Sequence, residues 1–432
     1  MPSKTWTNCR LCGHSELRTI LPIGDQPLSS VFPLPDEPDP STSPLELVRC
    51  AAPHCGLVQL RHTAELSEMY GATYGYYSSI SPMMVDHLRA KVDGLIKFAN
   101  LKPGDAVLDI GCNDGTLLNA YGVDRGLVRV GMDPSAKKFA SHYDPDIRVV
   151  YDFFGATGAR QLLGDKKCKV VTSIAMFYDL DDPVCFVRDI ASVLSEDGVW
   201  AAELSYLPLL LKQLTYDQVC HEHVTYIGLR EINAILQQCG MRLLEVWFND
   251  MNGGSFYFYA GKKNGSHKAN ANKLEALLSE ETILATEAPY ERLLNRVLNH
   301  RDEVRAFFGF AKSSGKSVCG YGASTKGNVV MNYCGIGPND LSVIGDRNPE
   351  KDGRVTPGTR IPIISHSKLR TLKPDYIFSF IWHLRKEVIT DELDYLRGGG
   401  KLVFALPRLH IVDASNYERY LKRSFEDLAF AT

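Results

Sequence analysis

The stretch from Gln218 to Val224 reads QVCHEHV and places two imidazoles around one carboxylate, in the order His221, Glu222, His223. Three adjacent side chains cannot all face one metal ion, and the stretch lacks the H-x-x-x-H spacing of a helical metal site. A neutral imidazole accepts a proton near neutral pH, and a nearby carboxylate can orient it. We therefore predict an acid/base role for this stretch, with a polar surface turn as the alternative.

A second segment with reactive side chains is YGATYGYYSS, residues 70–79. Tyrosine hydroxyls can donate hydrogen bonds to a ligand hydroxyl or to a developing enolate. Tyr74, Tyr76 and Tyr77 are therefore predicted to form a lid or a substrate wall. Aromatic packing alone is the alternative.

Four cysteines near the N-terminus form two pairs, Cys9 with Cys12 and Cys50 with Cys55. Two such pairs can close a tetrahedral shell of thiolates around zinc, each from a tight turn that the following glycine permits. The second pair encloses a longer loop, in which His54 is a possible substitute ligand. We expect a structural zinc, because four protein ligands leave no open position for chemistry. Four unrelated thiols are the alternative.

The clearest scaffold for these groups begins at VLDIGCNDGT, residues 107–116, where a short apolar strand runs into a glycine turn. The next strand ends at an aspartate that suits a ribose diol. A turn built for a pyrophosphate avoids carboxylates, yet this one carries two, so the expected ligand is a cation. The residues predicted to contact it are Asp109, Gly111, Asp114, Gly115, Asp133 and Pro134.

The order of the following segments predicts a complete sheet. Strands are expected within residues 147–154, 169–183 and 197–206, and two β-rich runs, 241–250 and 253–263, flank a Gly-Gly turn. Strands joined by so short a turn must pair antiparallel.

The C-terminal half predicts helices over residues 268–312 and then a second strand, glycine turn and helix at residues 317–328. This turn carries Lys326 and no carboxylate, so amides at a helix N-terminus together with an ammonium group suit a diphosphate. A purely structural crossover is the alternative. Strands and helices alternate to the end of the chain, which indicates a second Rossmann-like lobe.

The length, net charge and composition of the chain limit its number of domains, its partners and its location. A chain of 432 residues predicts two or three domains, and a net charge of -3 gives no basic excess for nucleic acid or an anionic membrane. Without a signal peptide or a long apolar segment the protein is expected to be cytoplasmic, and its eleven cysteines to be thiols, some of them bound to metal. The proline-rich residues 29–46 are expected to form a surface excursion.

The turn LDIGCNDG with the downstream GMDPS resembles the S-adenosylmethionine site of Rossmann-like methyltransferases. A longer ordered series (CRLCG, CGLVQL, YGYYSS, MFYDLDDP, CHEHVTY, GGSF and GYGASTKGN) resembles the C-methyltransferases that act on C3 of nucleotide-linked 4-keto-deoxysugars. The resemblance implies an α/β protein with a zinc-binding module at residues 1–68, a class I methyltransferase domain at 69–265, and a helical connector with a sugar-nucleotide lobe at 266–432. It also implies a monomer or weak homo-oligomer.

Residue roles carry over by position. The resemblance makes His223 the base, Glu222 its partner and Tyr76 a contact of the substrate or enolate, and it places the adenine ring at Asp152 and Phe153. Family members often have a tyrosine where this chain has Cys220. The residues expected to contact the substrate are Tyr77, Tyr178, Tyr321, Lys326 and Asn328.

Three rival functions remain open from the sequence. An O- or N-methyltransferase would keep the donor and change the acceptor atom. An NAD-dependent oxidoreductase would use both glycine turns. A zinc-ribbon interaction protein would have no catalysis.

Overall fold

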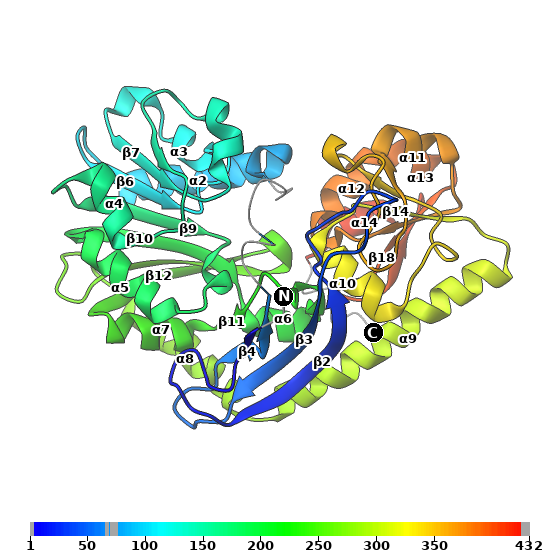
Figure 1. Ribbon diagram of the computed structural model, residues 1–432, viewed down its shortest axis with the longest axis horizontal. Coiled ribbons are helices and arrows are strands. Elements are labelled where there is room, and N and C mark those ends of the chain that lie inside the picture. Colours follow the sequence, from blue (N-terminus) through cyan, green and yellow to red (C-terminus); the bar gives the residue numbers. More distant parts are fainter. Residues whose placement is uncertain (1–3, 65–68, 70–76, 425–432) are drawn as a thin grey trace.

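The computed structural model describes residues 4–64, 69 and 77–424, and it shows two α/β lobes that face each other above a smaller N-terminal sheet (Figure 1). The long helix α9 (Ala288–Ser313) runs beneath the second lobe. No helix in these described ranges combines the length and apolarity needed to cross a membrane.

The N-terminal sheet has the strand order β11-β4-β3-β2, so its last strand comes from a distant part of the chain. Its strands are β2 (Leu17–Pro27), β3 (Thr42–Cys50), β4 (Val58–Leu60) and β11 (Thr225–Tyr226). The module also contains a two-stranded antiparallel ribbon, β1 (Lys4–Thr5) with β5 (His62–Thr63). The strand β11 directly follows the CHEH stretch, which attaches that stretch to the cysteine-bearing module.

The first lobe is built on a seven-stranded sheet of order β12-β13-β10-β9-β6-β7-β8. The strands are β6 (Ala106–Ile110), β7 (Val128–Met132), β8 (Arg148–Val150), β9 (Cys168–Ile174), β10 (Leu194–Ser205), β12 (Met241–Asn249) and β13 (Ser255–Lys262). All five residues of β6 are buried, as expected for a central parallel strand covered on both faces. β13 pairs antiparallel with both β10 and β12, which confirms the predicted reversed strand.

Helices cover both faces of this sheet. They are α2 (Pro82–Phe98), α3 (Thr116–Ala120), α4 (Ala156–Leu163), α5 (Pro183–Val193) and α7 (Leu229–Gln238). The short helix α6 (Leu207–Gln213) packs instead in the core that it shares with α9. After β7 the chain forms a 3-10 helix, Ala136–His142, which is interrupted by non-helical backbone at Phe139. α2 begins with Pro82 in its first turn, and the Ser81 side chain accepts a hydrogen bond from the Met84 amide.

The second lobe confirms the expected Rossmann-like arrangement, with the strand order β16-β15-β14-β17-β18-β19. Its strands are β14 (Val318–Tyr321), β15 (Ile344–Asp346), β16 (Ile363–Ser365), β17 (Tyr376–Ser379), β18 (Lys401–Phe404) and the antiparallel β19 (His410–Val412). Its helices are α10 (Thr325–Cys334), α11 (His366–Leu372), α12 (Arg385–Asp391), α13 (Leu393–Arg397) and α14 (Tyr417–Lys422).

The predicted connector is helical, as α8 (Ala271–Glu280) and α9. One hydrophobic core runs from β2 and β3 through α6 and α9 into the second lobe. The proline-rich segment after β2 is largely exposed at residues 34–39, and it also reaches the second lobe. There the Arg360 guanidinium donates to the Pro35 carbonyl at 2.7 Å, and Asn328 donates to the Ser29 carbonyl at 2.6 Å. The N-terminal module therefore braces both lobes.

Candidate active site and zinc centre

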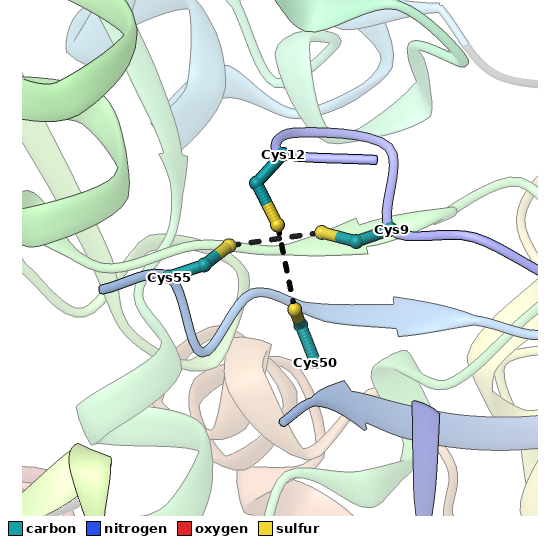
Figure 2. A group of neighbouring side chains, drawn as sticks. All are labelled: Cys9, Cys12, Cys50 and Cys55. Atoms are coloured by element: carbon teal, nitrogen blue, oxygen red, sulfur yellow. Dashed lines mark hydrogen bonds between the residues drawn. The ribbon is translucent and has the colours of Figure 1, made fainter. Parts of the chain in front are cut away.

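The four predicted cysteines converge on one point, as Figure 2 shows. All four sulfur atoms lie within 4.8 Å of one another, with 3.6 Å between Cys9 and Cys55 and 3.6 Å between Cys12 and Cys50. Zn–S bonds of about 2.3 Å in a tetrahedron require sulfur separations of about 3.8 Å, so the cluster fits zinc. His54 is exposed and is not one of the cluster members.

The thiols of the cluster differ in acidity. The hydrogen bond from Cys55 lowers the pKa of Cys9 to about 5, against the opposing effect of burial, and the same bond raises the pKa of Cys55. A thiolate is the form that binds metal. The four sulfurs leave no position for a substrate, which fits the predicted structural role.

A cavity of about 210 Å³ lies at the carboxyl ends of β6, β7 and β9. Its acidic floor includes Asp109, which is 3% exposed and accepts a hydrogen bond from the Thr172 hydroxyl at 2.5 Å. Burial raises the pKa of Asp109 to about 7, and the nearby Asp133 carboxylate adds to that effect. Gly111 adopts φ +73°, and a Cβ there would lie 3.1 Å from Met176. The cavity thus combines carboxylates with a close backbone approach.

Five of the eight predicted cofactor residues line this cavity: Asp109, Gly111, Asp133, Pro134 and Phe153. The other three, Asp114, Gly115 and Asp152, are not among its lining residues. Asp114 instead accepts hydrogen bonds from the Thr116 amide and hydroxyl and from the Ser79 amide at 2.8 Å. A Cβ at Gly115 would meet the Tyr143 ring at 2.7 Å, so this glycine is required by packing.

The end of the tyrosine segment is fixed to the glycine turn. The Asn113 side-chain oxygen accepts from the Ser78 amide at 3.0 Å, next to the contact of Asp114 with Ser79. Tyr77 packs against Phe139 with ring centroids 5.7 Å apart. Tyr74 and Tyr76 lie outside the described residues.

The CHEH stretch lies between the modules, with Cys220, His221 and Glu222 buried and His223 partly buried. His221 is fully buried, and its Nε2 lies 3.0 Å from the Ser43 carbonyl of β3. The His223 ring packs against Tyr178 at 4.2 Å between centroids. Burial, together with the positive charge of Lys326, lowers the pKa of His223 to about 3, against the opposing effect of a hydrogen bond with the Gln218 backbone. His223 is therefore neutral at physiological pH, and in this ligand-free state it is a weak base.

Glu222 contributes an unusual carboxylate. It is 6% exposed, and neither oxygen has a hydrogen-bond partner among the described residues. Its charge acts on His221, whose pKa is lowered by burial and partly restored by the Ser43 carbonyl and by Glu222. Two unpaired buried oxygens are costly, so this carboxylate is suited to a ligand's hydroxyl or ammonium group.

Lys326 reaches from the second lobe to the first, where its Nζ donates to the Asn252 carbonyl at 3.2 Å. Burial lowers the pKa of Lys326, whereas the carboxylate of Asp217 opposes that shift. Asp217 is 1% exposed and accepts from the Trp382 indole at 2.7 Å. His383 is also close, since the charge of Lys326 adds to burial in lowering the pKa of His383 to about 3. Both lobes therefore contribute to one buried polar centre.

Two other residues of the second lobe were predicted to contact the substrate, and both make hydrogen bonds within the protein instead. The Tyr321 hydroxyl accepts from the Arg347 guanidinium at 3.2 Å, and Asn328 is fully buried against Ser29.

A second cavity, of about 310 Å³, lies between the lobes. It shares Met84 and Asn252 with the acidic cavity, so the two adjoin. Its basic side chains are Arg385, Lys386 and Arg423, and its acidic side chains are Asp250 and Glu387.

Comparison with known proteins identifies the three modules. Residues 9–70 match the family described as "Putative zinc binding domain", residues 84–246 match a methyltransferase domain family, and residues 250–407 match the family described as the C-methyltransferase C-terminal domain. A curated relative, the C-methyltransferase NovU of Streptomyces niveus, is 29% identical over 412 residues, which span 94% of this chain and 97% of NovU.

The chain belongs to the S-adenosylmethionine-dependent C-methyltransferases with an N-terminal zinc module. This C-methyltransferase uses S-adenosylmethionine as methyl donor and carries a structural zinc. When bound, the donor supplies an electrophilic methyl group on a sulfonium cation. The acidic cavity at β6 and β7 fits such a cation, and we refer to it below as the donor cavity.

Solved methyltransferase structures resemble part of the chain. The magnesium protoporphyrin IX methyltransferase of Synechocystis PCC 6803 is 16% identical with a TM-score of 0.31, over 41% of this chain and 79% of its own. The plantazolicin methyltransferase BamL is 14% identical with a TM-score of 0.35, over 42% of this chain and 86% of its own.

Sequence reasoning missed several polar residues of the C-methyltransferase site. Asn252 and His383 lie in loops after β12 and β17, and His87 and Glu203 lie on α2 and at the end of β10. Only Glu203 had a usable signal, because an acidic residue at the carboxyl end of a central strand is a ligand candidate. The others become apparent only when the lobes are placed together.

Proposed function

We propose that this C-methyltransferase methylates the carbon next to the ketone, C3, of a nucleotide-linked 4-keto-deoxysugar through an enolate. The observation that carries the proposal is the interlobe cavity that adjoins the donor cavity and offers three cationic side chains. Its cationic side chains Arg385, Lys386 and Arg423 suit a diphosphate, because guanidinium and ammonium groups bind phosphate oxygens with charge-assisted hydrogen bonds. A sugar linked to that diphosphate can then extend toward the donor.

The proton acceptor in this proposal is His223. Its low pKa keeps it unprotonated before the acceptor binds. A weak base needs help to remove a carbon-bound proton, and Lys326 provides it by stabilising negative charge on the enolate oxygen. Binding of the anionic acceptor also offsets the charge of Lys326, so the pKa of His223 rises in the complex. The base is thus strengthened only when substrate is present.

The residue roles follow from this arrangement. His223 takes the C3 proton, and Lys326 and Glu222 contact oxygen atoms of the acceptor. Tyr178 holds the His223 ring, and Tyr76 remains a proposed enolate contact. Cys220 is fully buried beside Glu222 and provides no hydroxyl.

The test is His223→Ala, with the exposed His54→Ala as matched control. We expect His223→Ala to lower methyl transfer by about 10³-fold or more, as loss of a general base with its positioning does. Donor affinity, measured by calorimetry, should change less than about twofold, because His223 is not among the residues of the donor cavity. Normal turnover by His223→Ala would reject the role of His223.

Deuterium exchange tests the reaction type. Only carbon methylation requires loss of the C3 proton, so the wild-type enzyme should exchange that proton with deuterated water when S-adenosylhomocysteine is bound. Methyl transfer to a sugar oxygen without exchange would replace the proposal by the O-methylation alternative.

A further inference from the structure

A hydrogen-bonded group of four polar side chains is centred on Glu203, which lines the donor cavity. Glu203, at the end of β10, accepts from the His87 Nε2 at 2.7 Å and pairs with the Lys91 ammonium at 2.5 Å. The Asn249 amide donates to the same carboxylate at 2.8 Å. Glu203 is only 3% exposed, so this network holds a carboxylate in one position.

The network spans the two adjoining cavities. Glu203 lines the donor cavity and His87 lines the interlobe cavity. His87 is therefore the imidazole at the junction where the methyl donor and the proposed acceptor meet. Neither His87 nor Glu203 is used by the proton transfer assigned above.

The carboxylate fixes which nitrogen of the His87 ring donates to it. Burial raises the pKa of Glu203, but the hydrogen bond from His87 and the charge of Lys91 outweigh it, and the pKa lies below its usual value. Glu203 is thus ionised and can only accept hydrogen bonds, so the His87 Nε2 must carry the proton. In the neutral imidazole the other nitrogen, Nδ1, then has a free lone pair and accepts a hydrogen bond.

We infer that His87 is a substrate-positioning residue whose Nδ1 accepts a hydrogen bond from an acceptor hydroxyl next to the reacting carbon. This inference rests on the proposed keto-sugar function. A ketone oxygen cannot donate to Nδ1, whereas a sugar hydroxyl can. The site therefore selects keto-sugars that keep the C2 hydroxyl beside C3, and Glu203 acts through His87 by holding its tautomer.

The test compares two acceptors that differ in one group: thymidine-diphospho-4-keto-6-deoxyglucose and its 2-deoxy counterpart. In the wild-type enzyme the hydroxylated sugar should have the lower KM. His87→Phe should raise its KM about tenfold or more, as loss of a buried hydrogen bond does. The same change should leave the KM of the 2-deoxy sugar within about threefold, so the preference disappears.

Two further variants separate positioning from folding. His87→Gln retains an acceptor oxygen and should recover part of the preference, and Glu203→Gln should weaken it by releasing the tautomer. Loss of the preference with unchanged kcat for the 2-deoxy sugar supports positioning. An equal rise in KM for both sugars, or an unchanged preference in His87→Phe, would overturn the inference.

The same assays test the proposed function separately from the role of His87. If the wild-type enzyme methylates neither sugar, the proposed function fails and the inference fails with it. If the wild-type enzyme methylates at least one and His87→Phe does not discriminate, only the inference fails. Abolished C3 deuterium exchange in His87→Phe would instead make His87 the base and overturn the positioning role.

Discussion

The two lobes carry equivalent glycine turns with different surroundings. In the first lobe the Gly111 amide donates to the Met132 carbonyl at 2.8 Å, and in the second the Gly322 amide donates to the Gly345 carbonyl at 2.8 Å. In both, an aspartate at the end of the next strand accepts from a turn amide: Asp133 from Asn113 at 2.9 Å, and Asp346 from Ala323 at 2.7 Å. The hydrogen-bonding pattern of the two turns is therefore the same.

The charges around the two turns differ. Asp109 is buried on β6 beside Asp133, and in the described part of the chain neither carboxylate forms a salt bridge. The position equivalent to Asp109 in the second lobe is Gly320, and Lys351 lies close enough to Asp346 for their charges to interact. One turn thus keeps excess negative charge for a cation, and the other is neutralised. Shared backbone geometry therefore does not predict a shared ligand.

Among substitutions in the two turns, the largest effect is expected from Asp109→Asn in the donor cavity. It should weaken S-adenosylmethionine binding by about 10- to 100-fold, the range for a charged hydrogen-bonding group. Wild-type affinity should rise as pH increases through about 7, because the ionised carboxylate favours the sulfonium. The variant should lose this pH dependence in calorimetry at pH 6 and 8. Equal affinities in wild type and variant would remove the electrostatic distinction between the turns.

Stability should show the opposite pH trend. The carboxyl group of Asp109 has a pKa of about 7 in the fold, against 3.8 ordinarily. The ligand-free fold therefore gains stability from its proton below pH 3.8 and loses it as pH rises through 7.

A smaller effect is expected from Lys326→Met in the second turn. It should lower kcat by about tenfold through weaker enolate stabilisation. It should also raise the pKa of His223, because the charge of Lys326 now lowers it, and histidine NMR titration can measure this. Donor affinity should be unchanged. If Lys326→Met instead impaired donor binding alone, the assignment of Lys326 to the acceptor would be wrong.

The smallest effect on activity is expected from Asp346→Asn. Loss of the charge opposite Lys351 should cost about 1–3 kcal/mol of unfolding free energy, the range for a disturbed buried polar pair. Thermal melting should report this loss, while donor affinity stays within about twofold. Asp346→Asn thus serves as the matched control for Asp109→Asn. A comparable loss of donor affinity in both variants would merge the roles of the two turns.

The sequence was sufficient where the signal was local. The cysteine pairs predicted the thiol cluster, and the order of strands predicted the reversed β13. The direction of Lys326 was not predictable, because it depends on how the lobes are braced by contacts such as Trp382 with Asp217 and Asn328 with Ser29. These contacts join residues more than 160 positions apart and leave no periodicity. The pairing of His87 with Glu203 was not predictable for the same reason.

The strand β11 connects the cysteine cluster with the segment that carries His223. It follows His223 by two residues and pairs with β4, which begins three residues after Cys55. The Leu60 amide also donates to the Val224 carbonyl at 2.9 Å. Oxidation of the thiols, or removal of the zinc by a chelator, would therefore disturb the strand that positions His223 while the methyl donor still binds. The enzyme is open to remote inactivation by agents that never enter either cavity.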